Sequence, residues 1–159
     1  MVVFERPIRF EEVDAARIVF FARFSAYAHE AMERFFSPLE GGYPGLILDR
    51  RIGLPAVRVE VDFTAPVRYG DALRIETSVA RLGNRSATLR YRMFRARDGV
   101  LSADLQHTVV TTDLEAMESC PMPDDVRWLL AAHLEAAAAA DARAGREGGA
   151  AVQPDDAAG

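Results

Sequence analysis

The chain has 159 residues, half of them hydrophobic, and a formal net charge of −5. This length suits one domain with a real core and is too short for two, and the negative charge argues against a nucleic-acid partner, whose backbone would repel it. All 19 basic residues are arginine, so basic contacts to a phosphate or a carboxylate would use guanidinium groups, which favour bidentate geometry.

The first 51 residues predict one extended segment and one long helix. Residues Val2 to Glu12 read as extended, and Pro7 in their middle favours an edge strand or a bulge. From Ile18 to Phe36 apolar side chains recur at spacings of three and four, which predicts a helix with a broad apolar face. The recurring residues are Phe20, Phe24, Tyr27, Ala31 and Phe35. Ser37-Pro38 ends the helix, and residues 41–51 read as a glycine-rich loop followed by a short helical turn.

The middle of the chain alternates with a period of two, which is typical of strands with one buried face. Four consecutive strands are predicted, with turns at Tyr69-Gly70-Asp71, Gly83-Asn84-Arg85 and Asp98-Gly99. They are expected over residues 57–64, 73–79, 86–96 and 100–112. With the early strand and the long helix they predict an α+β domain, an antiparallel meander with the helix across one face.

A last helix is expected to open at Pro123, because proline and the two following acids suit a first helical turn. Its apolar side carries Val126, Leu129, Leu130, His133 and Leu134, and an alanine run follows. From Gly145 onward the composition is typical of a disordered tail.

The cellular compartment is predicted from the absence of paired cysteines, of a signal-peptide core and of a membrane-length apolar run. Cys120 is a single cysteine and has no partner for an internal disulfide, which fits a reducing environment. Charges at Glu5, Arg6 and Arg9 interrupt any signal-peptide core, and no run approaches the ~18 to 20 apolar residues of a membrane helix. We expect a cytoplasmic protein without a membrane partner.

Few residues offer chemistry. His29, His107 and His133 are scattered, and their spacing suggests neither a metal site nor a cofactor. Asp14 is the best-placed acid, since it lies between a strand and the start of a helix. The N–H groups at that helix end would polarise a carbonyl oxygen, and the carboxylate would attack its carbon or activate a water. The alternatives are a helix cap or a solvated loop acid.

The stretch from Ile8 to Phe21 resembles the signature of the 4-hydroxybenzoyl-CoA thioesterase family of hotdog-fold proteins, roughly F-x-D-x-D-x-x-G-I-V-[FW]-Y-P-x-Y. The segments HEAMERFF, LPAVRVEVDFTAPVRYGDALRIETSV, GNRSATLRYRMF and MPDDV follow the same pattern. The resemblance implies a hotdog domain over residues 1–127, with a five-stranded antiparallel sheet wrapped around a long central helix. Residues 128–144 would form a C-terminal helical extension and residues 145–159 a disordered tail.

The resemblance also implies roles for particular residues. Asp14 matches the catalytic aspartate, as nucleophile or general base, and the backbone N–H of Phe21 matches the donor that polarises the thioester carbonyl. Glu12 replaces the first acid of the motif and would support the loop. Arg85 and Ser86 match contacts to the CoA nucleotide, although a solvated turn arginine is nearly as good an interpretation. Members of the family form dimers or tetramers with active sites between subunits, so we expect the same here.

Three positions depart from the pattern. Arg17 replaces glycine, where it would block the substrate or contact an anion; Phe21 replaces tyrosine, and Ala22 replaces proline. Phe20 and His29 would contact the substrate, and His29 would face the acyl pocket and recognise a polar substituent, or more simply pack with its ring hydrogen-bonded. His107 is expected to point outward or into an interface.

The function predicted is hydrolysis of an aromatic or short- to medium-chain acyl-CoA to the free acid and CoA. One alternative substrate is an acyl carrier protein thioester. Another alternative is a non-catalytic hotdog module that binds an acyl ligand, and a hydratase of the same fold fits less well.

Overall fold

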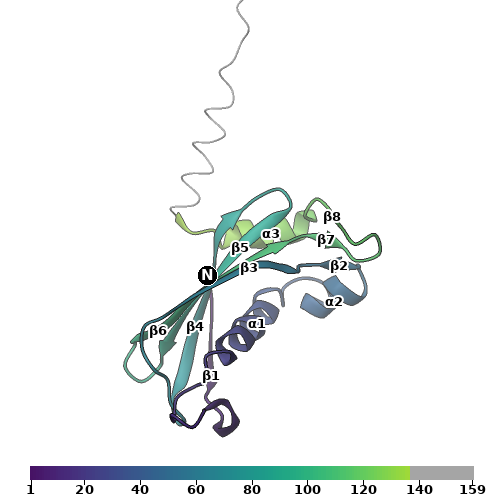
Figure 1. Ribbon diagram of the computed structural model, residues 1–159. Helices are drawn as coiled ribbons and strands as arrows, with labels where there is room; N and C mark the ends of the chain where they lie inside the picture. The colour runs from purple at the N-terminus through teal and green to yellow at the C-terminus, as the bar shows by residue number, and fades with distance from the viewer. Residues whose placement is uncertain (137–159) are drawn as a thin grey trace, which may run out of the picture.

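The computed structural model describes residues 1–136. Its main sheet has five antiparallel strands in the order β1-β4-β5-β6-β3, and helix α1 lies across one face of that sheet (Figure 1). The strands are β1 (Val2–Pro7), β3 (Ala56–Phe63), β4 (Ala72–Leu82), β5 (Ser86–Arg95) and β6 (Leu101–Val110). A small second sheet, not expected from the sequence, joins β2 (Ile52–Gly53), β7 (Thr112–Asp113) and β8 (Glu118–Ser119). The helices are η1 (Phe10–Glu12), α1 (Arg23–Phe35), α2 (Gly42–Leu48) and α3 (Asp124–Ala132).

The α+β class is confirmed, but the expected meander of four consecutive strands is wrong at its first step. β4, β5 and β6 do pair in chain order, whereas β3 pairs with β6 and not with β4. The place beside β4 is taken by β1, with Val2 opposite Thr77 and Pro7 opposite Ala72. The connection through residues 64–71 therefore carries the chain from β3 at one edge of the sheet across to β4, the strand next to the opposite edge.

β1 is an edge strand that ends at Pro7, so the edge prediction for this proline is confirmed. The extended segment does not continue to Glu12, because residues Phe10–Glu12 form a 3-10 turn. Proline has no N–H to donate to a sheet, so its place at the end of an outer strand costs no ladder hydrogen bond.

Helix α1 begins at Arg23, later than the predicted Ile18. The residues before it belong to a hairpin: Val19 pairs with Val13, and its N–H donates to the carbonyl of Val67 at 2.8 Å. Phe20 is consequently not part of the buried stripe and is 44% exposed. The rest of the stripe is confirmed, since the buried residues of α1 are Phe24, Tyr27, Ala28, Ala31, Met32 and Phe35.

The core lies between α1 and the inner face of the sheet. The helix covers β4 and β5 closely, with Ile75, Leu89 and Met93 fully buried. It leaves β3 uncovered, since Val57, Val59 and Phe63 are 60%, 48% and 51% exposed. The prediction that this strand has one buried face is therefore wrong for a single copy of the chain. β3 is the last strand of the sheet, and an uncovered apolar edge strand is a surface on which another chain can pair.

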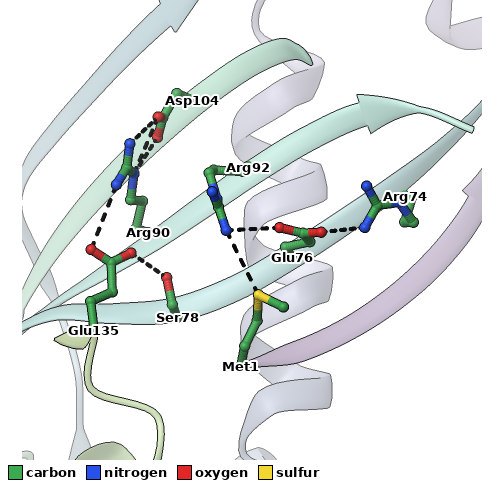
Figure 2. A network of polar contacts seen from close by, with 8 residues as sticks. All are labelled: Met1, Arg74, Glu76, Ser78, Arg90, Arg92, Asp104 and Glu135. Carbon is green, nitrogen blue, oxygen red and sulfur yellow. Dashed lines mark hydrogen bonds and ion pairs between the residues drawn. The ribbon is translucent and has the colours of Figure 1, made fainter. Parts of the chain in front are cut away.

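The outer face of the sheet, turned away from α1, carries a network of ion pairs (Figure 2). Glu76 lies between Arg74 and Arg92, and Arg90 lies 2.6 Å from Asp104. Side chains of opposite charge on neighbouring strands satisfy one another here, as is usual on a solvated sheet face.

The predicted last helix ends earlier than expected. α3 stops at Ala132, and Leu134 forms a bridge with Val79 of β4, so the apolar side of the helix does not extend to His133 and Leu134. The rest of the expected helical extension, residues 137–144, and the expected tail, residues 145–159, lie outside the described residues. α2 begins at Gly42, inside the expected loop, where Gly41 turns the chain with φ of 69°. None of the helices in residues 1–136 is long and apolar enough to cross a bilayer.

Candidate active site

Asp14 lies at the turn of a tight hairpin that precedes α1. Val13 and Val19 pair across the hairpin, and the N–H of Asp14 donates to the carbonyl of Ile18 at 2.9 Å. The N–H of Arg17 donates to the carbonyl of Asp14 at 2.9 Å and closes the turn. Arg17 has φ of 62°, a left-handed conformation that glycine adopts most readily, and the motif that this stretch resembles has glycine at the same position.

The carboxylate of Asp14 is exposed and only partly engaged. One oxygen, Oδ1, accepts a hydrogen bond from the N–H of Ala16 at 2.8 Å, which orients the side chain within the turn. No arginine or histidine in the described part of the chain forms an ion pair with it. The helix-cap alternative is wrong, because the residue at the N-cap of α1 is Ala22 and no side chain caps it.

The backbone N–H of Phe21 is a free donor at the start of α1. Of the nearby amides, the N–H of Phe20 donates to the carbonyl of Glu12 at 3.0 Å and that of Arg23 donates to the carbonyl of Phe20 at 2.9 Å, whereas that of Ala22 has no acceptor within the described residues. Within residues 1–136 no group accepts a hydrogen bond from the N–H of Phe21. Its partial positive charge is therefore available to a hydrogen-bond acceptor that approaches this end of the helix.

Glu12 anchors the segment between β1 and Asp14. Its carboxylate lies 2.7 Å from a guanidinium nitrogen of Arg6 and accepts the N–H of Arg9 at 2.7 Å. Arg6 in turn stacks over the ring of Tyr27 in α1, with the guanidinium carbon 3.9 Å from the ring centre. Burial would raise the pKa of Glu12, but the hydrogen bonds from Arg6 and Arg9 and the charge of Arg6 outweigh it and hold that pKa below its usual value.

Asp14 and Phe21 line two different cavities. A cavity of about 540 Å³ is bounded by Asp14, Arg17, Arg68, Tyr69 and Phe10. A second, of about 290 Å³, is apolar and runs past Phe21, Phe24 and Phe63. One copy of the chain thus supplies the carboxylate and the amide, but it does not enclose both in one cavity.

Two histidines, one on α1 and one on β6, line a third cavity. A cavity of about 220 Å³ is lined by His29 and Ser25 of the helix and by Val59 and His107 of the sheet. His107 is therefore on the helix side of the sheet, and the prediction that it points outward is wrong. Burial, and the nearby His29, lower the pKa of His107, which keeps its ring neutral near pH 7. His29 is exposed rather than packed in the core, with Nε2 3.2 Å from Oε1 of Glu33.

Arg85 and Ser86 are far from Asp14 in the same chain. They follow β4 at its C-terminal end, beside α3 and β8, whereas the Asp14 hairpin lies at the N-terminal end of β4 (Figure 1). β4 has 11 residues, so the two ends are separated by roughly 35 Å. The guanidinium of Arg85 donates to the carbonyl of Ser119 at 2.7 Å. Only a second copy of the chain would bring these residues to an Asp14 site.

The sequence prediction missed Arg68 and His107. Arg68 lies next to the predicted turn at Tyr69, and no local pattern links it to a hairpin more than fifty residues earlier. For His107 a signal existed, since it shares the odd-numbered face of its strand with the buried Leu105 and Val109. Within residues 1–136 no three histidine, cysteine or acidic side chains gather in a way that would hold a metal ion.

Residues 8–130, most of the chain, match the thioesterase-like superfamily. The chain belongs to this family. It is similar to a 1,4-dihydroxy-2-naphthoyl-CoA hydrolase of Synechococcus elongatus, with 31% identity over 79% of this chain and 93% of the relative. The thioesterase-like assignment is coarser than the 4-hydroxybenzoyl-CoA thioesterase family expected from the motif, and that narrower placement remains a prediction.

Solved structures of thioesterases have the same fold. A thioesterase superfamily protein of Jannaschia sp. CCS1 has 32% identity and a TM-score of 0.78, covering 85% of this chain and 94% of its own. The gentisyl-coenzyme A thioesterase BH1999 has 28% identity and a TM-score of 0.72, covering 81% and 99%. The predicted hotdog fold is confirmed.

Proposed function

We propose that this thioesterase-like protein hydrolyses an aromatic or short- to medium-chain acyl-CoA to the free acid and CoA. The predicted enzyme class, a thioester hydrolase, is confirmed by the family and by relatives named as CoA thioester hydrolases. Those relatives are named for acyl groups that carry aromatic rings, and the cavity beside Phe21, Phe24 and Phe63 offers apolar walls for such a group.

The observation that carries the proposal is an exposed carboxylate, that of Asp14 in the hairpin, and an amide without an acceptor, that of Phe21, which follows the same hairpin at the start of α1. The thioester carbonyl oxygen would accept the N–H of Phe21, which stabilises the negative charge that develops on that oxygen. The carboxylate of Asp14 would either attack the carbonyl carbon and form an anhydride that water opens, or take a proton from the attacking water. In both routes the C–S bond breaks and CoA leaves as the thiol.

A second copy of the chain is part of this proposal. The exposed residues Val57, Val59 and Phe63 on β3 form an uncovered edge that a second β3 would pair with and cover. Because one chain holds Asp14 and Arg85 at opposite ends of β4, an assembled site would take its CoA contacts from a partner, as a homodimer or homotetramer. Light scattering of the purified protein measures this state directly, and a monomer that retains full turnover would contradict it.

The deciding experiment replaces Asp14 by Asn, which keeps the shape of the side chain and its hydrogen bond to Ala16. We expect kcat against benzoyl-CoA to fall about a thousandfold, because an amide is neither nucleophile nor base, while the melting temperature stays the same. The matched control is Asp49→Asn, an exposed acid at the end of α2 outside these cavities, which should leave kcat unchanged. Turnover retained by the Asp14 variant would refute the mechanism, and binding without turnover by the wild-type protein would favour a non-catalytic acyl-binding module.

A further inference from the structure

Arg17 occupies a strained position beside the proposed catalytic carboxylate. Its φ of 62° lies in the left-handed region, which long side chains rarely adopt. Glycine would close the same turn without strain, so nothing in the backbone requires an arginine there. Strain of this kind is kept where the side chain has a task, and the side chain of Arg17 lines the 540 Å³ cavity.

A second arginine, Arg68, lines the same cavity. Arg68 follows β3, in the segment that leads to β4; its backbone N–H donates to Oδ2 of Asp71 at 2.9 Å and its carbonyl accepts the N–H of Asp71 at 3.1 Å, but its guanidinium forms no hydrogen bond within the described residues. Within the described residues the guanidinium groups of Arg17 and Arg68 form no ion pair with an acidic side chain. Asp14 is the only acidic residue that lines the cavity. The lining therefore carries two positive groups and one negative group, although the net charge of the whole protein is −5.

Two exposed aromatic rings flank these charges. Phe10 and Tyr69 are 75% and 63% exposed, and their ring centres lie 5.6 Å apart in an edge-to-face arrangement. Aromatic rings left open beside unpaired arginines are typical of a surface that a ligand covers, because the rings contribute contact area and the guanidinium groups contribute charge.

We infer that this cavity binds an anionic group of the substrate, a phosphate or a carboxylate, between Arg17 and Arg68. The inference rests on the proposed function, because it assumes the same reaction. It adds that the substrate carries a negative charge and that Arg17 and Arg68 recognise that charge. Both anions have the planar or forked oxygen pairs that guanidinium groups hold with two hydrogen bonds. The phosphates belong to CoA, and the carboxylate would belong to the acyl group, so the two sources are separable by the choice of substrate.

Four thioesters test this site: benzoyl and 4-carboxybenzoyl groups, each carried by CoA and by N-acetylcysteamine, which has no phosphate. The variants are Arg17→Gly and Arg68→Gln, and the control is Arg81→Gln, an exposed arginine at the far end of β4. If CoA phosphate is bound, the ratio of kcat/KM for CoA over N-acetylcysteamine thioesters falls about tenfold in both variants, whichever acyl group is used.

If the acyl carboxylate is bound, the ratio for 4-carboxybenzoyl over benzoyl falls about tenfold with both carriers. The control changes neither ratio. Ratios that stay within about twofold of wild type in both arginine variants overturn the inference, as does an equal change in the Arg81 variant. Melting temperatures show that the variants are folded.

Binding measurements separate this inference from the proposed reaction. If the wild-type protein hydrolyses none of the four thioesters, the proposed function fails, and calorimetry with CoA and with 4-carboxybenzoate still tests the cavity. Binding of either probe that weakens about tenfold in Arg68→Gln supports the anion site. Absence of binding to wild type, or equal binding to wild type and variant, refutes it.

Discussion

The carboxylate of Glu12 and the guanidinium of Arg6 form a buried ion pair, with Oε1 and Nη2 2.7 Å apart and both side chains less than a tenth exposed. This pair joins the end of β1 to the segment that carries Asp14. The backbone carbonyl of Glu12 also accepts the N–H of Phe20, the residue before the free amide of Phe21. One residue therefore sets the positions of both sides of the candidate site.

Glu12→Gln should destabilise the fold by about 3 kcal/mol, because it leaves the buried charge of Arg6 with only the partly exposed Glu30 as an acidic partner. Urea unfolding measures this difference. The matched control is Glu11→Gln, whose exposed carboxylate lies 4.0 Å from Arg9 and should change stability by less than about 0.5 kcal/mol. Equal effects of the two substitutions would show that the pair contributes no more than a surface contact.

The same pair predicts a pH dependence of stability. Because the pKa of Glu12 in the folded protein lies below its ordinary value of 4.5, the unfolded chain takes up the proton first as the pH falls. The contribution of Glu12 is complete above about pH 4.5 and is lost as the pH falls through its folded pKa. Unfolding free energies measured from pH 6 to pH 3 should therefore fall more steeply for wild type than for Glu12→Gln. Parallel curves would contradict the prediction.

Replacing Arg17 should reveal the strain in its turn. Arg17→Gly removes a left-handed conformation that costs a non-glycine residue about 1–2 kcal/mol, and the added freedom of the unfolded chain takes back about half of that gain. We expect a net gain of about 0.5 kcal/mol by urea unfolding. Ala16→Gly, at a neighbouring position without positive φ, should instead lose about 0.5 kcal/mol. A loss of stability in Arg17→Gly would mean that the side chain itself holds the hairpin.

His29 and His107 should select acyl groups that carry a polar substituent. His29 follows Phe21 by eight residues, roughly 12 Å if that stretch is measured as helix, and the rings of His29 and His107 line one cavity. We expect 4-hydroxybenzoyl-CoA to be hydrolysed about tenfold faster than benzoyl-CoA in kcat/KM. His107→Phe, which keeps a ring but no hydrogen-bonding nitrogen, should abolish that preference.

His133→Asn serves as the control for this histidine pair. His133 lies at the end of α3, where Nδ1 contacts the carbonyl of Leu129 at 2.9 Å, a contact that the amide of asparagine can replace. The substrate preference should not change in this variant. If the preference for 4-hydroxybenzoyl-CoA remained in both His29→Phe and His107→Phe, residues other than these two histidines would recognise the substituent.

The sequence predicted the local structure around Asp14 better than it predicted the order of the strands in the sheet. The motif located Asp14 and the free amide of Phe21 because both lie in one short segment, whose turn and hydrogen bonds are local. The start of α1 was placed too early because Ile18 and Val19 continue an apolar pattern that a hairpin partner, Val13, uses instead. Arg85 matched the motif equally well, yet the structure places it at the other end of β4, since a motif carries no information on distance.

The sequence alone determined the local features of this protein: the alternation of its strands, the turn at Asp98-Gly99, the buried face of α1 and the position of Asp14. These local features depend on backbone geometry over a few residues, and the spacing of apolar side chains along the sequence reflects that geometry. Only the tertiary structure decided that β1 rather than β3 lies beside β4, and that Arg68 and His107 join Asp14 and His29 at their cavities. Such pairs are separated by tens of residues, and they meet because the whole sheet packs on one helix.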